Sequence, residues 1–349
     1  MTAGLAADLH PAHDRARAAA GSRALLGRCL DLCIRSTGRL RFRSFDPRDA
    51  ICISGMARGG TTWLAEVLAS DPCHLLIFEP LQLHSGPEPL HHGFNRLNYH
   101  REGDDWSRQI TFLENTLHGY ALNRRTLRPW WSVFTPHRYT RLLVKFVNAN
   151  MLLPLLHRSL GAQWVMLIRH PCAVVSSQIR WGAKDDKRSL FIPPGLFEDF
   201  PLLEHVFDRL DGLEDVLAFK WAMQQVPALS YPKPYPWLVG FYEWIYHDRF
   251  TQLTRLCNFF GIDGERISFA QSYKPSSVTM SDSSILSGED HLRAWKRRLH
   301  KSAITRILDV VHACGIDVYS DSEMPVRSIA AELEINSGAP QSAGVGVRQ

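Results

Sequence analysis

The sequence of residues 50–68 is AICISGMARGGTTWLAEVL. Its first part, residues 50–55, is a short apolar run that ends in glycine, which indicates a buried strand. From Trp63 onward apolar residues recur at helical spacing, so a helix follows. The glycines between these elements let the backbone wrap around an anion, and the free N–H groups at a helix start point toward it. The order strand, glycine loop, helix therefore predicts an anion-binding turn.

This loop differs from the phosphate loop of nucleoside triphosphatases, which places a lysine directly before its Ser or Thr. Here Thr61 occupies that place, and the cation of the loop is Arg58. The pattern fits an anion with one phosphate and one further charged group better than a β/γ-phosphate pair. A plain strand–turn–helix, in which the glycines serve only the turn, is the structural alternative.

The rest of the chain alternates strand patterns with helix patterns. Further strands are predicted at residues 75–78, 141–147, 163–168 and 237–242, and helices at 173–181, 213–225, 248–260 and 291–313. This alternation predicts an α/β fold, with a mostly parallel sheet flanked by helices and a P-loop-like anion loop. We assign the core to residues 46–325, a basic helical appendage to 1–45 and a flexible tail to 326–349.

The N-terminal appendage is rich in arginine, and it predicts a basic amphipathic helix. Such a helix either packs as a solvated helix on the domain or makes weak contact with an anionic membrane surface. The net charge of +5 over 349 residues is modest. It favours a local anion site over a surface that binds nucleic acid.

The composition also bears on location and on metals. No uninterrupted apolar run approaches the roughly 20 residues that span a bilayer, and we see no secretory signal pattern. The seven cysteines are scattered and odd in number, which indicates reduced thiols rather than a disulfide framework. No set of cysteines and histidines has zinc-site spacing. We therefore expect a cytoplasmic protein without a metal site.

A second candidate site follows a later predicted strand. Arg169 ends that strand, and Ser177 lies eight residues further along the next helix. A guanidinium and a hydroxyl so placed can hold one phosphate between them. Tyr242 and Glu243 also lie at a strand end. Because ligands of open α/β sheets bind at the carboxyl ends of the strands, we expect all of these groups to meet at one edge.

In this order and spacing the motifs resemble the sulfotransferases that use 3′-phosphoadenosine-5′-phosphosulfate (PAPS). ARGGTTWL resembles their 5′-phosphosulfate loop, IRHPCAVVSSQIR their 3′-phosphate segment, FYEWIYHDRFTQLTRLCNFFGI a later Tyr-Glu segment and HLRAWKRRL their closing helix. The resemblance covers roughly residues 48–320. LLIFEPLQL most resembles the carbohydrate, or Golgi-type, branch of the family.

The resemblance implies a role for each matching residue. The residues matched to the 5′-phosphosulfate are Arg58, Gly59, Gly60, Thr61 and Thr62. Trp63 matches a tryptophan that lies against the adenine, Arg169 and Ser177 match the pair on the 3′-phosphate, and Tyr242 matches a tyrosine near the nucleotide. PAPS would be the co-substrate, with no metal required.

The chain also departs from the family pattern. Gly59 replaces a serine and His170 replaces Asp or Asn, and the Arg-Lys-Gly motif of cytosolic members is absent. Candidates to replace that motif are Ser276, Ser277, Thr279, Arg293 and Lys296.

The implied reaction needs a base for the acceptor hydroxyl and a cation for the leaving oxygen. Glu79, at the end of the second strand, matches the catalytic Glu of some branches, and Arg58 would supply the cation. Glu79 as a structural partner of an arginine is the alternative. Rival bases are His84, His91 and His92.

The acceptor would be a carbohydrate, lipid or small molecule that carries a hydroxyl. Its pocket is expected from residues 81–105 and from the aromatic and basic residues Trp130, Trp131, Phe134, Tyr139, Arg124, Arg125 and Arg128. Two other functions stay open at this point. A P-loop kinase would bind ATP with magnesium, and a non-catalytic nucleotide-binding protein would keep the loop without a working base.

Overall fold

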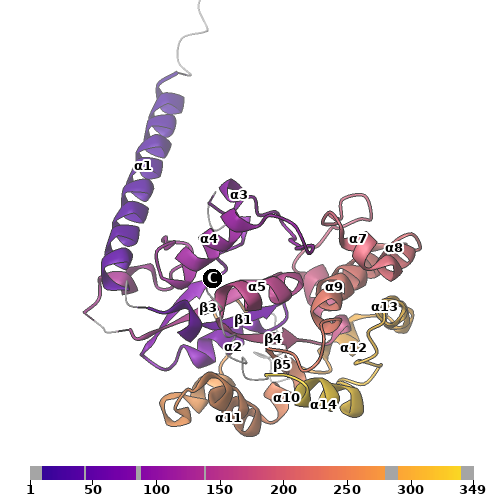
Figure 1. Ribbon diagram of the computed structural model, residues 1–349. Coiled ribbons are helices and arrows are strands. Elements are labelled where there is room, and N and C mark those ends of the chain that lie inside the picture. The colour runs from indigo at the N-terminus through magenta and orange to yellow at the C-terminus, as the bar shows by residue number, and fades with distance from the viewer. Residues whose placement is uncertain (1–9, 43–44, 84–87, 137–138, 280–289, 339–349) are drawn as a thin grey trace, which may run out of the picture.

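The computed structural model describes residues 10–42, 45–83, 88–136, 139–279 and 290–338, with side chains from residue 25 onward. Its centre is one sheet of five parallel strands in the order β2–β3–β1–β4–β5. The strands are β1 (Ile51–Gly55), β2 (His74–Phe78), β3 (Arg141–Val147), β4 (Gln163–Ile168) and β5 (Leu238–Phe241). The predicted α/β fold with a parallel sheet flanked by helices is confirmed (Figure 1).

Helices cover both faces of the sheet, which is why its strands are apolar almost throughout. Ile51 and Ile53 of β1 pack on one face, against α2 (Thr61–Leu68) and α11 (Arg249–Phe260). Cys52 points to the other face, into the cluster formed with α6 (Pro171–Arg180), α9 (Leu213–Leu229) and α13 (Lys301–Ala313). Every residue of β1 is buried, so the loop that follows this central strand is held firmly.

The remaining helices lie around this core. They are α1 (His10–Arg41), α3 (Glu88–His91), α4 (Ser107–Leu117), α5 (Leu153–Leu160), α7 (Leu196–Asp199), α8 (Pro201–Phe207), α10 (Tyr242–His247), α12 (Ala294–Arg298) and α14 (Arg327–Ile335). Short 3₁₀ helices include η3 (Trp130–Phe134) and η6 (Phe269–Tyr273). The helix predicted over 291–313 is two helices, because the chain leaves helical geometry at Leu299 and His300 caps α13.

The two ends of the chain differ from each other. Helix α1 has 32 residues and projects from the body of the protein, in indigo in Figure 1. The tail expected to be flexible from residue 326 instead forms α14, which buries Ala330 and Leu333 and pairs Glu334 with Arg255 at 2.8 Å. Residues 339–349 lie outside the described residues. Of the helices that the structure describes, none combines the length and the apolar character needed to cross a bilayer.

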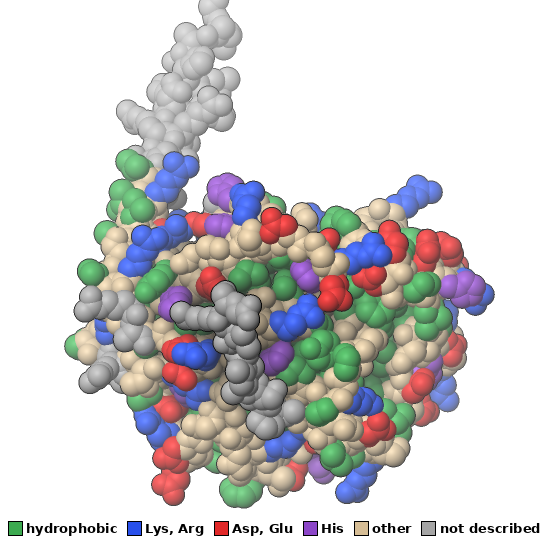
Figure 2. Space-filling view, in the orientation of Figure 1, with side chains coloured by type: hydrophobic (Ala, Val, Ile, Leu, Met, Phe, Trp, Pro, Cys, Tyr) green, Lys and Arg blue, Asp and Glu red, His purple; other side chains and the backbone are tan. Residues whose placement is uncertain are grey.

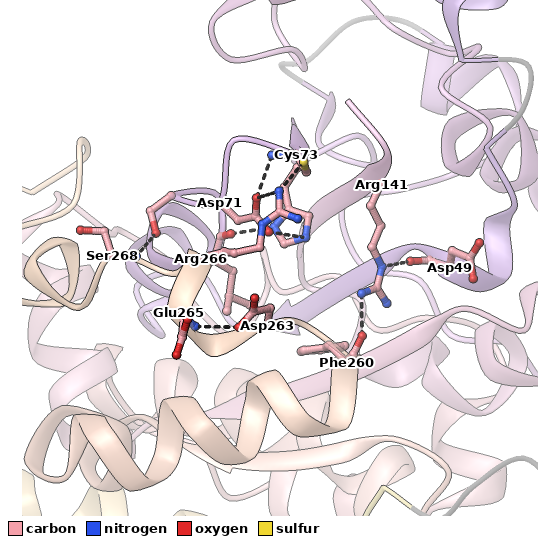
Figure 3. Close-up of polar contacts among 12 residues, drawn as sticks. Asp49, Asp71, Cys73, Arg141, Phe260, Asp263, Glu265, Arg266 and Ser268 are labelled. Carbon is pink, nitrogen blue, oxygen red and sulfur yellow. Dashed lines mark hydrogen bonds and ion pairs between the residues drawn. The ribbon is translucent and has the colours of Figure 1, made fainter. Parts of the chain in front are cut away.

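The amino edge of the sheet is held by two arginines, Arg141 and Arg266 (Figure 3). Arg141, at the start of β3, donates from Nη1 to the Phe260 carbonyl at 2.5 Å and from Nε to the Asp49 carbonyl. Arg266 donates to Asp71 Oδ1 at 3.0 Å. These contacts tie α11 and the loops around it to the strand starts. The carboxyl edge, where the candidate residues lie, faces a cavity.

Candidate active site

A cavity of about 380 Å³ lies at the carboxyl edge of the sheet. Nine of the ten residues predicted to bind the donor or to catalyse the reaction line it: Arg58, Gly60, Thr61, Thr62, Trp63, Glu79, Arg169, Ser177 and Tyr242. The tenth, Gly59, is buried in the turn itself, where its N–H donates to the Met56 carbonyl at 2.9 Å. A Cβ at Gly59 would lie 2.8 Å from that oxygen, so a side chain there conflicts with the turn.

The loop between β1 and α2 presents backbone donors to the cavity. Gly60 has φ 90° and is the N-cap of α2, and a Cβ on it would lie 2.3 Å from the Tyr242 ring. Arg58 also has a positive φ, of 69°. This left-handed backbone is unusual for a residue with a side chain. The N–H groups of the first turn of any helix lack a partner within the helix. Since Gly60 has no side chain to cap α2, these groups can bind an anion.

The guanidinium of Arg58 contacts Ser177 of α6 and Trp181 at the carboxyl end of that helix. Its Nε donates to Ser177 Oγ at 3.0 Å, and it stacks 4.7 Å from the centre of the Trp181 ring. Burial lowers the pKa of Arg58, and the charges of Arg169 and Arg180 lower it further. The guanidinium groups of Arg58, Arg169 and Arg180 are thus close enough to repel one another, and a bound anion would offset this repulsion.

Arg169, at the end of β4, faces the same space. Its Nη1 donates to the Arg58 carbonyl at 3.0 Å, its Nη2 contacts Nε2 of His291 at 2.9 Å, and its guanidinium lies 4.4 Å from the centre of the Tyr242 ring. Burial and the Arg169 charge lower the pKa of His291 to about 2, so this imidazole is neutral and can accept.

Two buried polar atoms beside this cluster are without partners in the part of the chain that the structure describes. They are Nε of Arg169 and Oγ of Ser176, and both residues line the cavity. A buried polar group left without a hydrogen bond costs stability. Arg58 links the two residues that were predicted to hold one phosphate: its Nε donates to Ser177 Oγ, and its carbonyl accepts from Arg169 Nη1.

His170, where the family has Asp or Asn, has a structural role. Its Nδ1 accepts from the Cys172 N–H at 3.2 Å and caps α6, and its Nε2 donates to the Ser320 carbonyl at 3.0 Å. Burial lowers the pKa of His170 to about 3. The neighbouring Glu243 is buried as well, and it accepts from the His170 N–H and from the Tyr319 hydroxyl. Burial raises the pKa of Glu243.

Glu79 faces the cavity from the end of β2 and forms an ion pair with Lys145 of β3. Its backbone has φ 48°, and its N–H donates to the Lys145 carbonyl at 2.8 Å. Only 2% of the Lys145 side chain is exposed, and burial lowers its pKa while Glu79 opposes that shift. Sequence reasoning missed Lys145. The available signal was a lysine inside the apolar strand RLLVKFV.

Three more arginines line the cavity. They are Arg128, which lies 3.9 Å from the centre of the Phe78 ring, Arg180 of α6 and Arg298 of α12. Of the residues suggested in place of the absent Arg-Lys-Gly motif, Ser276 and Thr279 line the cavity. Arg293 and Lys296 instead pair with Glu323, and Ser277 hydrogen-bonds to Glu66. Arg298, which the sequence did not single out, lines the cavity from α12.

The rival bases and the expected acceptor aromatics lie elsewhere. His91 is the last residue of α3 and His92 follows it, and neither lines this cavity; His84 lies outside the described residues. The η3 aromatics are exposed on the surface instead of lining the cavity. Arg124 pairs with Asp31 at 3.6 Å, and Tyr139 lines a separate shallow hollow of about 310 Å³. Across the described ranges, no three His, Cys, Asp or Glu side chains are grouped to hold a metal ion.

Comparison with known proteins returned matches among solved structures only. No family model and no curated protein matches the chain. The sulfotransferase domain of a Synechococcus olefin synthase is 17% identical over 77% of this chain and 95% of its own, with a TM-score of 0.43. The sulfotransferase domain from the curacin biosynthetic pathway is 20% identical over 75% of this chain and 97% of its own, with a TM-score of 0.37.

A mouse sulfotransferase solved in complex with PAP (3′-phosphoadenosine 5′-phosphate) is 16% identical to this chain. The match covers 80% of this chain and 92% of the mouse protein, with a TM-score of 0.37. All three matches are described as sulfotransferases or sulfotransferase domains.

Proposed function

We propose that this protein transfers the sulfuryl group of PAPS to a hydroxyl of an acceptor. One observation carries the proposal: a single cavity contains an anion-binding loop with converging arginines and, facing it, the carboxylate of Glu79. The first set of groups suits a donor with two anionic ends, and the carboxylate suits an acceptor that must lose a proton.

The donor fits the groups that the cavity offers. The N–H groups of Thr61 and Thr62 and the guanidinium of Arg58 would hold the 5′-phosphosulfate, as at other helix N-termini that bind phosphate. Arg169 and Ser177 would hold the 3′-phosphate. The partnerless Nε of Arg169 supports this assignment, because a phosphate oxygen would satisfy it.

Further residues extend the donor site. Ser176 and Arg298 line the same side of the cavity and can replace the missing Arg-Lys-Gly motif. Trp63 and Tyr242, whose rings lie 5.5 Å apart, would border the adenine. None of these assignments calls for a metal ion, because backbone amides and arginines neutralise the donor.

In the transfer, the acceptor oxygen attacks sulfur and a new S–O bond forms. The S–O bond to the 5′-phosphate breaks, and its electron pair leaves on 3′-phosphoadenosine 5′-phosphate (PAP). The acceptor proton passes to the carboxylate of Glu79, and Arg58 stabilises the charge that develops on the leaving oxygen. Lys145 holds Glu79 at the edge of the cavity through their ion pair.

The acceptor would be a carbohydrate, lipid or small molecule, and Arg128 lies where it can attract an anionic one. We keep a cytoplasmic location as part of the proposal, which the seven free thiols support.

Thermal unfolding of the full chain with PAP, AMP and ATP–Mg²⁺ tests the donor. Ligand at 100 times its dissociation constant stabilises a protein by about 2.7 kcal/mol. We expect PAP to raise the melting temperature well above the effect of AMP at equal concentration, because AMP lacks the 3′-phosphate. A larger shift with ATP–Mg²⁺ than with PAP would overturn the proposal in favour of a kinase. PAP binding without turnover on any hydroxyl acceptor would indicate a non-catalytic protein.

A further inference from the structure

Helix α1 has one face that packs on the protein and one that faces solvent. Gly27, Ile34 and Gly38 are buried, the two glycines against Arg124 and Leu122. The exposed side carries four leucines, whose exposed fractions are 64% for Leu25, 72% for Leu26, 63% for Leu32 and 75% for Leu40. Cys29 and Cys33 are exposed between them. At 3.6 residues per turn, these six residues fall within about 120° of the helix circumference.

A second exposed apolar group adjoins the end of this helix. Trp130, Trp131 and Phe134 of η3 are 38%, 54% and 46% exposed. Arg41, the last residue of α1, donates from Nη1 to the Val133 carbonyl at 2.6 Å and so fixes η3 against the helix. We call the four leucines and these three aromatics the docking face. A large exposed apolar patch marks a contact with a partner or a membrane.

The charge around the docking face is positive. Arg28 and Arg39 are exposed and border the leucines. Asp31 is the one acidic residue between positions 25 and 42 of the sequence, and it pairs with Arg124. Figure 2 shows green and blue side chains together on the lower part of α1, below the grey segment. A second copy of the chain would bring arginine against arginine, whereas an anionic surface complements them.

We infer that the docking face binds the surface of an anionic lipid bilayer. The leucines would enter the boundary between headgroups and acyl chains, as the apolar face of an interfacial helix does. Tryptophan is enriched at that boundary, and arginines near it gain from anionic lipid headgroups. Arg128, directly before Pro129 and η3, lines the cavity, so the docking face adjoins the end of the cavity that contains Glu79.

Vesicle co-sedimentation of the full chain tests this inference independently of the proposed function. The vesicles are phosphatidylcholine alone or with about 30% phosphatidylserine, at low and at high salt. We expect binding to the anionic vesicles that falls steeply with salt. The double variant Leu25→Glu/Leu32→Glu should lose at least tenfold in affinity, because burial of both leucines is lost and negative charge is added.

Leu202→Glu and Phe250→Glu form the matched control, because these side chains are 51% and 70% exposed on α8 and α11, away from α1 (Figure 1). They should bind vesicles like the parent chain. Since all substituted side chains are exposed, melting temperatures should change little, and their measurement separates a binding defect from misfolding. Arg28→Gln/Arg39→Gln should weaken binding to anionic vesicles by about tenfold or more and leave the weak binding to neutral ones unchanged.

Equal binding of the parent chain to neutral and anionic vesicles, or none to either, would overturn the inference. Sedimentation velocity without lipid tests the competing occupant. A dimer that Leu25→Glu/Leu32→Glu dissociates would assign the docking face to a second copy of this chain instead.

Discussion

Arginines lie at both edges of the parallel sheet, but their hydrogen bonds are satisfied in different ways. At the amino edge, Arg141 donates to the Asp49 and Phe260 carbonyls and to Gln163 Oε1. At the carboxyl edge, Nε of Arg169 is buried with no partner within the described ranges. The neighbouring guanidinium of Arg58 is opposed by two like charges.

The difference separates arginines that hold the fold together from arginines that we propose bind the donor. A guanidinium has five N–H donors. Arg141 directs its donors to two carbonyls and an amide oxygen, and Arg266 pairs with the carboxylate of Asp71. Three guanidiniums converge on one cavity and repel one another. The carboxylate of Glu79 also lines this cavity, but it is already paired with Lys145. An anion bound among these guanidiniums would offset their mutual repulsion.

The largest effect is expected from Glu79→Gln, which tests whether the carboxyl edge performs chemistry. The amide keeps the shape and can still accept from Lys145, but it is a poor proton acceptor. Turnover should fall by about 10²–10⁴-fold, the usual contribution of a positioned base. PAP affinity, measured by calorimetry on the same sample, should be retained. Near-normal turnover, or loss of PAP binding along with activity, would remove Glu79 from the role of base.

Arg169→Ala tests the donor side of the same edge. Loss of charge-assisted hydrogen bonds to the 3′-phosphate should weaken PAP binding by about 1.5–3 kcal/mol. AMP binding should change little, because AMP has no 3′-phosphate. The matched control is Arg266→Ala at the amino edge, which should alter neither affinity. Equal losses for PAP and AMP in Arg169→Ala would contradict the assignment.

Arg141→Met should give the opposite pattern. It removes the three hydrogen bonds of the guanidinium to Asp49, Phe260 and Gln163, so urea unfolding should show a loss of about 1–3 kcal/mol in the free energy of unfolding. PAP affinity should be that of the parent chain. A variant that loses PAP binding while its stability is unchanged would erase the distinction between the two edges.

The smallest effect concerns pH. Burial lowers the pKa of His170 to about 3, whereas an unfolded histidine titrates near pH 6.5. The unfolded chain therefore takes up a proton that the folded chain does not, and stability should be full above pH 6.5 and decline as the pH falls toward 3. His291, with a pKa lowered to about 2, contributes with the same sign.

Substitution of His170 isolates one part of that decline. His170→Asn retains a side chain able to cap α6. It should reduce the slope of the free energy of unfolding against pH by the equivalent of about one proton, or about 1.4 kcal/mol per pH unit. Denaturant unfolding at pH 5, 6 and 7 measures it. An unchanged slope in His170→Asn would show that this imidazole is not the buried neutral group.

Much of this protein follows from local patterns along the sequence. Apolar runs bounded by glycine, alternating with helical periodicity, predicted five strands and a parallel sheet, because strands covered on both faces must be apolar throughout. The loop from Arg58 to Trp63 and the residues Arg169 and Tyr242 were predicted to meet because each follows a strand, and parallel strands end at one edge. Their individual roles came from the family resemblance. Local signals fail where packing decides, as in α14, which lies inside the segment 326–349 that was predicted to be a flexible tail.

Tertiary structure alone decided which charged groups meet. Lys145 is separated from Glu79 by 66 residues, and only the pairing of β2 with β3 places them in contact. Arg298 belongs to the cavity while Arg293 and Lys296 pair with Glu323, although all three share one short stretch of sequence. The physical reason is range: propensity and periodicity act between near neighbours, whereas an ion pair depends on where the folded backbone delivers each side chain.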